Sequence, residues 1–279
     1  MKLRLYHHSD GARIAYREVG TGPGLGLLHS AGLSHREWEP LVDQLSDRFR
    51  LVLPDLPLHG DSEDRPRHPY SPDWLADVVA GFCRATLGPR PIVGGHAEGA
   101  ELLVRAVGAG RLTPSRLVLM PNRMHGPPAH PGMLRSWKAI TSCAAFPGLD
   151  RALSYGAQAV FRPALGSRLS VRDNPAARDL VRHAFADVGG NGNRARSWGK
   201  VARRWPTSAS PATLSTLAGV QAPVLLLWAR EDRHHPLALA EEALERLPDG
   251  QLRVLSGTGF LIAYDDPVGV GRELAAFCA

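Results

Sequence analysis

The sequence is poor in cysteine and lacks any long hydrophobic run. Its three cysteines, Cys83, Cys143 and Cys278, are scattered and odd in number, which excludes a disulfide framework and a regular metal-binding spacing. No stretch approaches the ~18 apolar residues of a membrane span, and residues 1–8 lack a signal peptide's apolar core. We therefore expect a cytoplasmic protein without membrane contact. No motif predicts a metal or another cofactor.

Acidic residues are scarce in the middle of the chain. Between Pro121 and Thr213, fourteen Lys or Arg residues stand against four Asp residues, whereas the remainder has 19 basic and 23 acidic residues. No basic run or aromatic stacking pattern accompanies this charge, which argues against nucleic acid as a partner. A basic segment attracts an anionic substrate or an acidic carrier protein. A solvated arginine-rich surface explains the charge equally well.

Outside this segment, short apolar runs alternate with amphipathic runs. Eight apolar runs predict strands, at residues 3–7, 13–19, 25–28, 50–53, 91–94, 116–120, 223–228 and 251–255. Helical patterns fill the intervals, at residues 38–45, 72–87, 98–107, 236–247 and 268–277. Buried strands that alternate with helices indicate a mostly parallel sheet with helices on both faces.

Residues 121–213 break this rhythm, because they contain Pro/Gly clusters and broken helical runs but no strand pattern. The helical runs cover residues 132–145, 152–161, 175–186 and 195–205. The sequence therefore predicts a core of residues 1–120 and 214–279 with a helical cap at 121–213. Ligands of open α/β sheets bind at the carboxyl ends of the strands, so we expect the cap to cover that edge.

A sharp strand-to-helix turn is predicted at Gly95-His96-Ala97-Glu98-Gly99. Glycines at both ends permit a strained elbow, which lifts the central residue above the sheet edge in front of a helix N-terminus. In G-x-S-x-G enzymes this central residue is the serine nucleophile. Here it is Ala97, whose methyl group cannot attack a substrate.

Five motifs together resemble the α/β-hydrolase fold superfamily, in its capped haloperoxidase-like, esterase and epoxide hydrolase branches. The motifs, in chain order, are His29–Gly32, Asp55–Ser62, the elbow Gly95–Gly99, Trp228–Pro236 and Gly257–Pro267. The resemblance implies an eight-stranded, mostly parallel sheet with an α-helical cap.

The family's Ser-Asp-His triad is incomplete in this sequence. Asp232 falls on the acid position, but Ala97 occupies the nucleophile position and Phe260 the histidine position. No histidine follows His235. Because neither alanine nor phenylalanine can transfer a proton, we reject hydrolysis through the triad.

Several groups around the elbow remain able to act on a ligand. The backbone amides of Ala31 and Glu98 are expected to form an oxyanion hole above Ala97. The side chain of Glu98 is a candidate acid or base; its alternative role is a solvated residue in the first helical turn.

Asp232 is either satisfied by backbone amides or binds a ligand proton. His234 and His235 both lie close enough in sequence to assist Asp232, and His234 is the candidate catalytic histidine. Ser30 adds a hydroxyl group beside the oxyanion loop. Phe260 and Trp137 are expected to line the pocket. These positions are interpretations of spacing and resemblance.

The leading hypothesis is an enzyme that binds a largely apolar small molecule and promotes a cyclase, lyase, isomerase or pericyclic reaction of natural product biosynthesis. It would act through shape, amide donors and Glu98 rather than through a nucleophile. Relatives with altered triads among cyclases and lyases support this class by resemblance. The alternatives are an inactive ligand-binding protein and, third, a hydrolase that activates water through Asp232 or Glu98.

Overall fold

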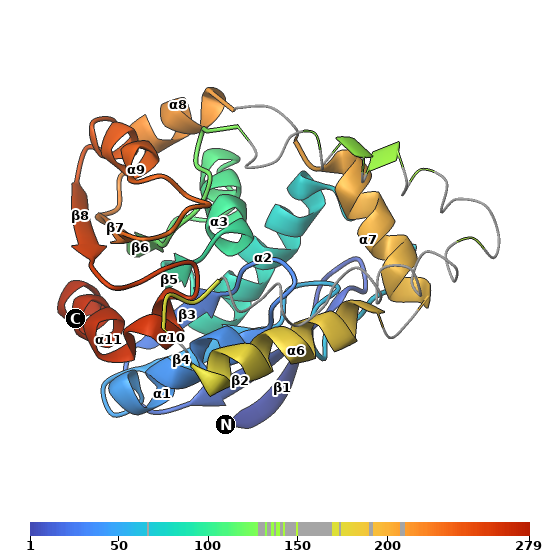
Figure 1. Ribbon diagram of the computed structural model, residues 1–279, viewed down its shortest axis with the longest axis horizontal. Helices are drawn as coiled ribbons and strands as arrows, with labels where there is room; N and C mark the ends of the chain where they lie inside the picture. Colours follow the sequence, from blue (N-terminus) through green and yellow to red (C-terminus); the bar gives the residue numbers. More distant parts are fainter. Residues whose placement is uncertain are drawn as a thin grey trace.

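The computed structural model describes residues 1–65, 67–127, 169–172, 174–189, 192–206 and 210–279, together with a few positions between 132 and 149. Its centre is an eight-stranded sheet with the order β1-β2-β4-β3-β5-β6-β7-β8 (Figure 1). The strands are β1 (Lys2–His7), β2 (Arg13–Val19), β3 (Gly24–Leu28), β4 (Arg50–Pro54), β5 (Ile92–Gly95), β6 (Arg116–Leu119), β7 (Val224–Ala229) and β8 (Gly250–Leu255).

The sheet is mostly parallel, as predicted. Only β1 with β2 and β2 with β4 pair in antiparallel fashion, and every later pairing is parallel. The eight predicted strands agree with the observed ones within a few residues. The short, uninterrupted apolar runs made this prediction possible, because both faces of the central strands are buried.

Helices cover both faces of the sheet. One apolar cluster packs Val224, Leu226 and Trp228 against the side of α2 (Pro72–Leu87), α3 (Glu98–Gly108) and α9 (Leu237–Leu244). The alternate residues Leu225 and Leu227 pack on the other face against α1 (Glu39–Leu45) and α11 (Pro267–Cys278). Successive side chains of a strand point to opposite faces, so β7 serves both clusters.

Two short helices, η1 (His35–Trp38) and α10 (Ile262–Asp265), lie at the ends of loops. Between β6 and β7 the described helices are α6 (Pro175–Gly189), α7 (Gly192–Arg204) and α8 (Ala212–Ala218). The first two agree with predicted helical runs; the predicted runs at 132–145 and 152–161 lie largely outside the described residues. The division into core and cap stays a prediction.

Basic side chains of α7 bind backbone carbonyls of the loop that follows β4. Arg194 donates to Gly60 O (3.2 Å), Lys200 to His68 O (3.1 Å) and Arg204 to Pro69 O. These cations hold α7 against the sheet core rather than standing free for an anionic partner. Among the described helices, none is both long and apolar enough to cross a membrane.

Candidate functional site

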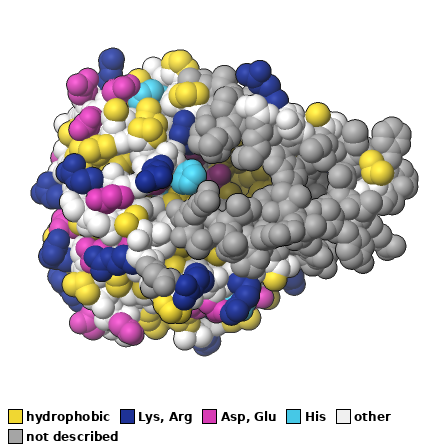
Figure 2. Space-filling model, in the orientation of Figure 1, with side chains coloured by type: hydrophobic (Ala, Val, Ile, Leu, Met, Phe, Trp, Pro, Cys, Tyr) yellow, Lys and Arg dark blue, Asp and Glu magenta, His cyan; other side chains and the backbone are white. Residues whose placement is uncertain are grey.

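A cavity of about 640 Å³ lies at the carboxyl end of β5 and along α3, a volume typical of small-molecule sites. Figure 2 shows an acidic side chain recessed beside hydrophobic ones, with histidine and Lys or Arg side chains nearby. The described lining residues that carry acid or base groups are Asp73, Glu98, Glu101, Arg105, Arg123, His234 and His235. The site therefore combines a concave shape with several titratable groups.

Ala97 forms the elbow that the sequence predicts. Its backbone has φ 45° and ψ −116°, a conformation that costs a non-glycine residue about 1–3 kcal/mol. Close packing imposes it: a Cβ atom on Gly95 would lie 2.5 Å from Gly99 C, and one on Gly99 would lie 2.5 Å from Leu28 O. The methyl group of Ala97 lines the cavity, so the elbow presents no nucleophile to a ligand.

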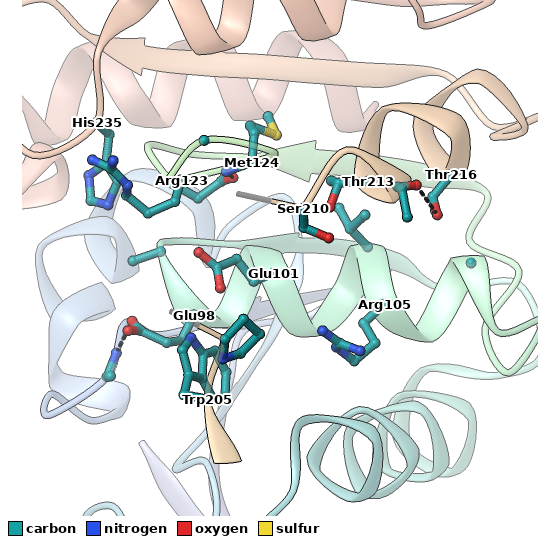
Figure 3. A pocket seen from close by; sticks show the side chains of 18 of the residues that line it. Glu98, Glu101, Arg105, Arg123, Met124, Trp205, Ser210, Thr213, Thr216 and His235 are labelled. Atoms are coloured by element: carbon teal, nitrogen blue, oxygen red, sulfur yellow. Dashed lines mark hydrogen bonds between the residues drawn. The ribbon is translucent and has the colours of Figure 1, made fainter. Parts of the chain in front are cut away.

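The loop after β3 directs three consecutive amides toward acceptors within the chain. Ser30 N donates to Glu37 Oε2 (2.7 Å), Ala31 N to Glu98 Oε2 (2.8 Å) and Gly32 N to His59 Nε2 (2.9 Å). The expectation that the Ala31 amide is open to a ligand oxygen is therefore wrong, because the Glu98 carboxylate accepts the hydrogen bond from this amide (Figure 3). A carboxylate is a strong acceptor for a backbone N–H.

Two glutamates, Glu98 and Glu101, stand one turn apart on α3 and both line the cavity (Figure 3). Burial and the neighbouring Glu98 charge raise the pKa of Glu101 to about 8, although a hydrogen bond from the Arg123 backbone lowers it. Glu101 is therefore a protonated acid at neutral pH. Two carboxylates this close do not easily ionise together.

Asp232 and His235 form a hydrogen-bonded pair at the cavity wall, of which His235 is a lining residue. His235 Nδ1 lies 2.8 Å from Asp232 Oδ2, and the His234 amide donates to Asp232 Oδ1 (2.7 Å). Burial raises the pKa of Asp232, but the interactions with His235, the His234 amide and His96 together outweigh burial and leave this pKa below its usual value. Burial lowers the pKa of His235 more than Asp232 raises it. The pair is thus a carboxylate and a neutral imidazole at pH 7.

This pairing corrects the choice between the two histidines. Asp232 bonds the ring of His235, whereas His234 contributes its backbone amide to Asp232 and its ring to the cavity lining. Adjacent residues in an irregular loop point in different directions, which sequence spacing does not reveal. His235 is 5 % exposed and is one of the residues that line the cavity. Because Nδ1 bonds Asp232, Nε2 is the nitrogen that the neutral ring retains as a proton acceptor.

Phe260 lies among three histidine rings at the elbow end of the cavity. Its ring stacks on His235 (centroids 5.6 Å apart, 25° between planes), lies 4.6 Å from His96 and meets His234 edge-on at 6.0 Å. Phe260 lines the cavity as predicted. It also supplies an apolar surface that keeps the His235 ring in place.

Behind this aromatic cluster, the buried His96 binds the buried Glu37 through Nδ1. Burial lowers the pKa of His96, but the Glu37 carboxylate more than compensates and raises it above its usual value. Burial raises the pKa of Glu37, and His96 together with the Ser30 amide reverses that shift. This ion pair ties the loop at Ser30 to the elbow.

Two other predicted positions do not contribute to the described lining. Ser30 is fully buried, and it is absent from the described residues around the cavity. Trp137 lies outside the described residues. Sequence reasoning missed Glu101, although its place three residues after Glu98 on a predicted helix was a usable signal. It also missed Glu37, which comes from a distant element. In the described part of the chain, no three His, Cys, Asp or Glu side chains converge on a possible metal site.

The alpha/beta hydrolase family model matches residues 27–272. The chain therefore belongs to the alpha/beta hydrolase family. An uncharacterized protein from Mycobacterium tuberculosis is 23% identical over 277 residues, which cover 96% of this chain and 77% of the relative. A 2-(acetamidomethylene)succinate hydrolase from Mesorhizobium japonicum is 37% identical over 90 residues, 32% of each chain.

Solved structures give the same fold. A thermophilic esterase from Thermogutta terrifontis, with malate bound, has a TM-score of 0.77 and 20% identity; the match covers 100% of this chain and 98% of the esterase chain. At this identity the likeness concerns the fold, and the chemistry must be argued from the side chains of this chain.

Proposed function

We propose that the chain is a cofactor-independent enzyme that moves protons on a largely apolar small molecule, in an isomerisation, elimination or ring closure without a covalent intermediate. The observation that carries this proposal is the pairing of a neutral base with a protonated acid around one cavity. The base is His235, oriented by Asp232, and the acid is Glu101. Alanine at the elbow leaves no serine for acyl transfer.

The proposed step can be written for a β,γ-unsaturated ketone. His235 Nε2 takes the proton from the carbon between the carbonyl group and the double bond, while Glu101 donates its proton to the carbonyl oxygen. The resulting dienol then accepts the proton from His235 at its γ carbon and returns the hydroxyl proton to Glu101. The product is the conjugated ketone, and both side chains recover their starting states. General acid–base steps of this kind contribute about 10²- to 10⁴-fold each.

The test uses 3-cyclohexenone and follows the absorbance of its conjugated isomer. We expect the wild type to exceed the buffer rate, His235→Gln to lower kcat/KM by about 10²-fold or more, and Glu101→Gln to lower it by at least 10-fold. His183→Gln is the matched control, because His183 is exposed on α6. Isomerisation no faster than in buffer, or unchanged in both variants, would overturn the proposal.

The same assay has a pH signature. The His235 base must be neutral, so the rate falls on the acid side of a pKa below 6.5. The Glu101 acid must be protonated, so the rate falls as pH rises through about 8. We expect a bell-shaped kcat/KM profile between these limits, and Glu101→Gln to remove its alkaline limb while keeping the acid limb.

A second candidate is a hydrolase in which His235 activates water directly, which the Asp232–His235 bond favours. The named esterase and hydrolase among the similar proteins support it at the level of the family. p-Nitrophenyl butyrate separates the two candidates. Ester turnover that shows no initial burst of p-nitrophenol, and that is lost in His235→Gln, supports water activation. A lack of ester turnover together with ketone isomerisation supports the first proposal. Inactivity toward both, with retained ligand binding, identifies an inactive binding protein.

A further inference from the structure

The cavity extends along α3 well beyond the acid–base groups. Its lining includes Ala97, Glu101, Arg105 and Ala109, positions that recur on one side of the helix. At about 1.5 Å per residue, the distance from Ala97 to Ala109 is about 18 Å. Figure 3 shows Glu98, Glu101 and Arg105 in succession along this helix. The cavity is therefore an elongated groove.

The two ends of this groove differ in exposure. Ala97 and His235, at the elbow end, are each 5 % exposed. Gly108 and Ala109, at the other end, are exposed, and Thr216 beside Gly108 is half-buried. Glu98, His234 and Phe260, also at the elbow end, are half-buried. Among the described residues, the groove is thus less exposed where the acid–base groups lie than at its open end, where α3 ends. A ligand that reaches the base from the open end must occupy the length between them.

The side chains change character along the groove. Val104, Met124 and Trp205 line the cavity, and Figure 3 shows Trp205 beside Glu98 and Met124 across from Glu101. These side chains suit an apolar chain. The hydroxyl residues Ser210, Thr213 and Thr216 also line the cavity, and Figure 3 shows them farther along α3 than Glu98, with Thr216 nearest the end of the helix. Thr216 Oγ1 donates to Ala212 O (3.2 Å) and keeps its acceptor capacity. Hydroxyl groups both donate and accept, so they match amides and alcohols.

We propose that the substrate is an elongated molecule whose reacting end lies at the elbow and whose uncharged hydrogen-bonding tail lies on the hydroxyl groups of residues 210–216. The tail consists of amide groups or of several alcohol groups, joined to the reacting end by an apolar chain, so that it offers more hydrogen-bonding groups than the single hydroxyl of a simple alcohol. This inference rests on the proposed function for the location of the reacting end. Arg105 pairs with Asp73 (3.0 Å), so its charge is already compensated and does not call for an anionic tail.

Three octyl compounds test the tail. Isothermal titration calorimetry compares 1-octanol, N-octanoyl-β-alaninamide and octanoyl-N-methylglucamide, each below its critical micelle concentration. We expect at least one tailed compound to bind about 10-fold more tightly than octanol, which corresponds to a few neutral hydrogen bonds. Tighter binding of the amide compound identifies an amide tail, and tighter binding of the glucamide identifies a polyol tail.

The variant that tests the site is Thr213→Val. It should weaken binding of the preferred tailed compound about 3- to 10-fold and leave octanol binding unchanged. Thr86→Val is the matched control, because Thr86 is a helical threonine on α2 outside the cavity lining. Equal affinity for all three compounds, or equal effects of the two variants, would overturn the inference. Because this readout is binding, it is independent of the ketone assay, and either proposal can fail alone.

Discussion

At the scale of single residues, the site depends on side chains that hold one another in a given protonation state. The neutral His235 is oriented by an ionised Asp232, and the acid form of Glu101 is favoured by burial and by Glu98. A protonated carboxylic acid next to a carboxylate is a means of keeping a proton available near pH 7. Neither group needs a nucleophile at Ala97 for this chemistry.

Glu101 also makes a prediction about stability. Its folded-state pKa of about 8 lies above the ordinary value of 4.5, so the folded state holds a proton that the unfolded state releases. The stability that this proton contributes is complete below pH 4.5 and is lost as pH rises through about 8. We expect Glu101→Gln to be more stable than the wild type at pH 8 by about 1–3 kcal/mol.

Urea unfolding at pH 5 and pH 8 measures this difference. The gain from Glu101→Gln should shrink toward zero at pH 5, where the wild-type carboxyl is protonated in the folded state. Glu241→Gln, on the exposed side of α9, provides a comparison without a buried proton. A gain of the same size at both pH values would contradict the assigned pKa.

At the scale of elements, the elbow joins β5 to α3 through two close approaches between backbones. Gly99→Ala should destabilise the fold by about 2–4 kcal/mol, because the added Cβ atom would lie 2.5 Å from Leu28 O on β3. The higher helix propensity of alanine returns only about 1 kcal/mol. Chemical denaturation measures the loss.

Gly219→Ala is the control for Gly99→Ala. A Cβ atom there would make ordinary contacts, 3.5 Å from Thr216 O, and Gly219 has a negative φ of −90°. If both variants unfold at similar denaturant concentrations, the backbone contact at Gly99 does not constrain the elbow.

The sequence predicted elements better than contacts between them. Strand β7 and helix α2 were legible because an apolar run or a capped amphipathic pattern identifies each locally. The position of Ala97 followed from its flanking glycines, and that of Phe260 from Gly259 and Asp266-Pro267 in a motif that resembles the family's. Nothing local indicated that Glu98 accepts from Ala31, 67 positions away, or that His235 rather than His234 binds Asp232. Such choices depend on side-chain directions that only the folded chain determines.

At the scale of the whole molecule, three cationic side chains of α7 connect this helix to the sheet core. They donate to backbone carbonyls of Gly60, His68 and Pro69 in the loop after β4. We expect the triple variant Arg194→Gln, Lys200→Gln, Arg204→Gln to be cleaved faster by a protease within residues 192–206, with little change in the unfolding of the sheet core. Limited chymotrypsin digestion and mass spectrometry locate the cuts.

Arg272→Gln is the control for charge alone, because Arg272 is an exposed residue of α11 that pairs with its neighbour Glu273 (3.0 Å). Unchanged cleavage of the triple variant would show that other contacts hold α7 without these cations. One such contact is that between the rings of Trp198 and His59, whose centroids lie 4.9 Å apart.

The bond between the Ala31 amide and Glu98 has a consequence for selectivity. A ligand oxygen that binds this amide must displace the carboxylate, so one hydrogen bond is exchanged for another and the net gain is small. This amide, expected as an oxyanion-hole donor, would then discriminate little between substrates. Choice among competing molecules would fall to the remainder of the groove, and directed changes of specificity should begin at its open end.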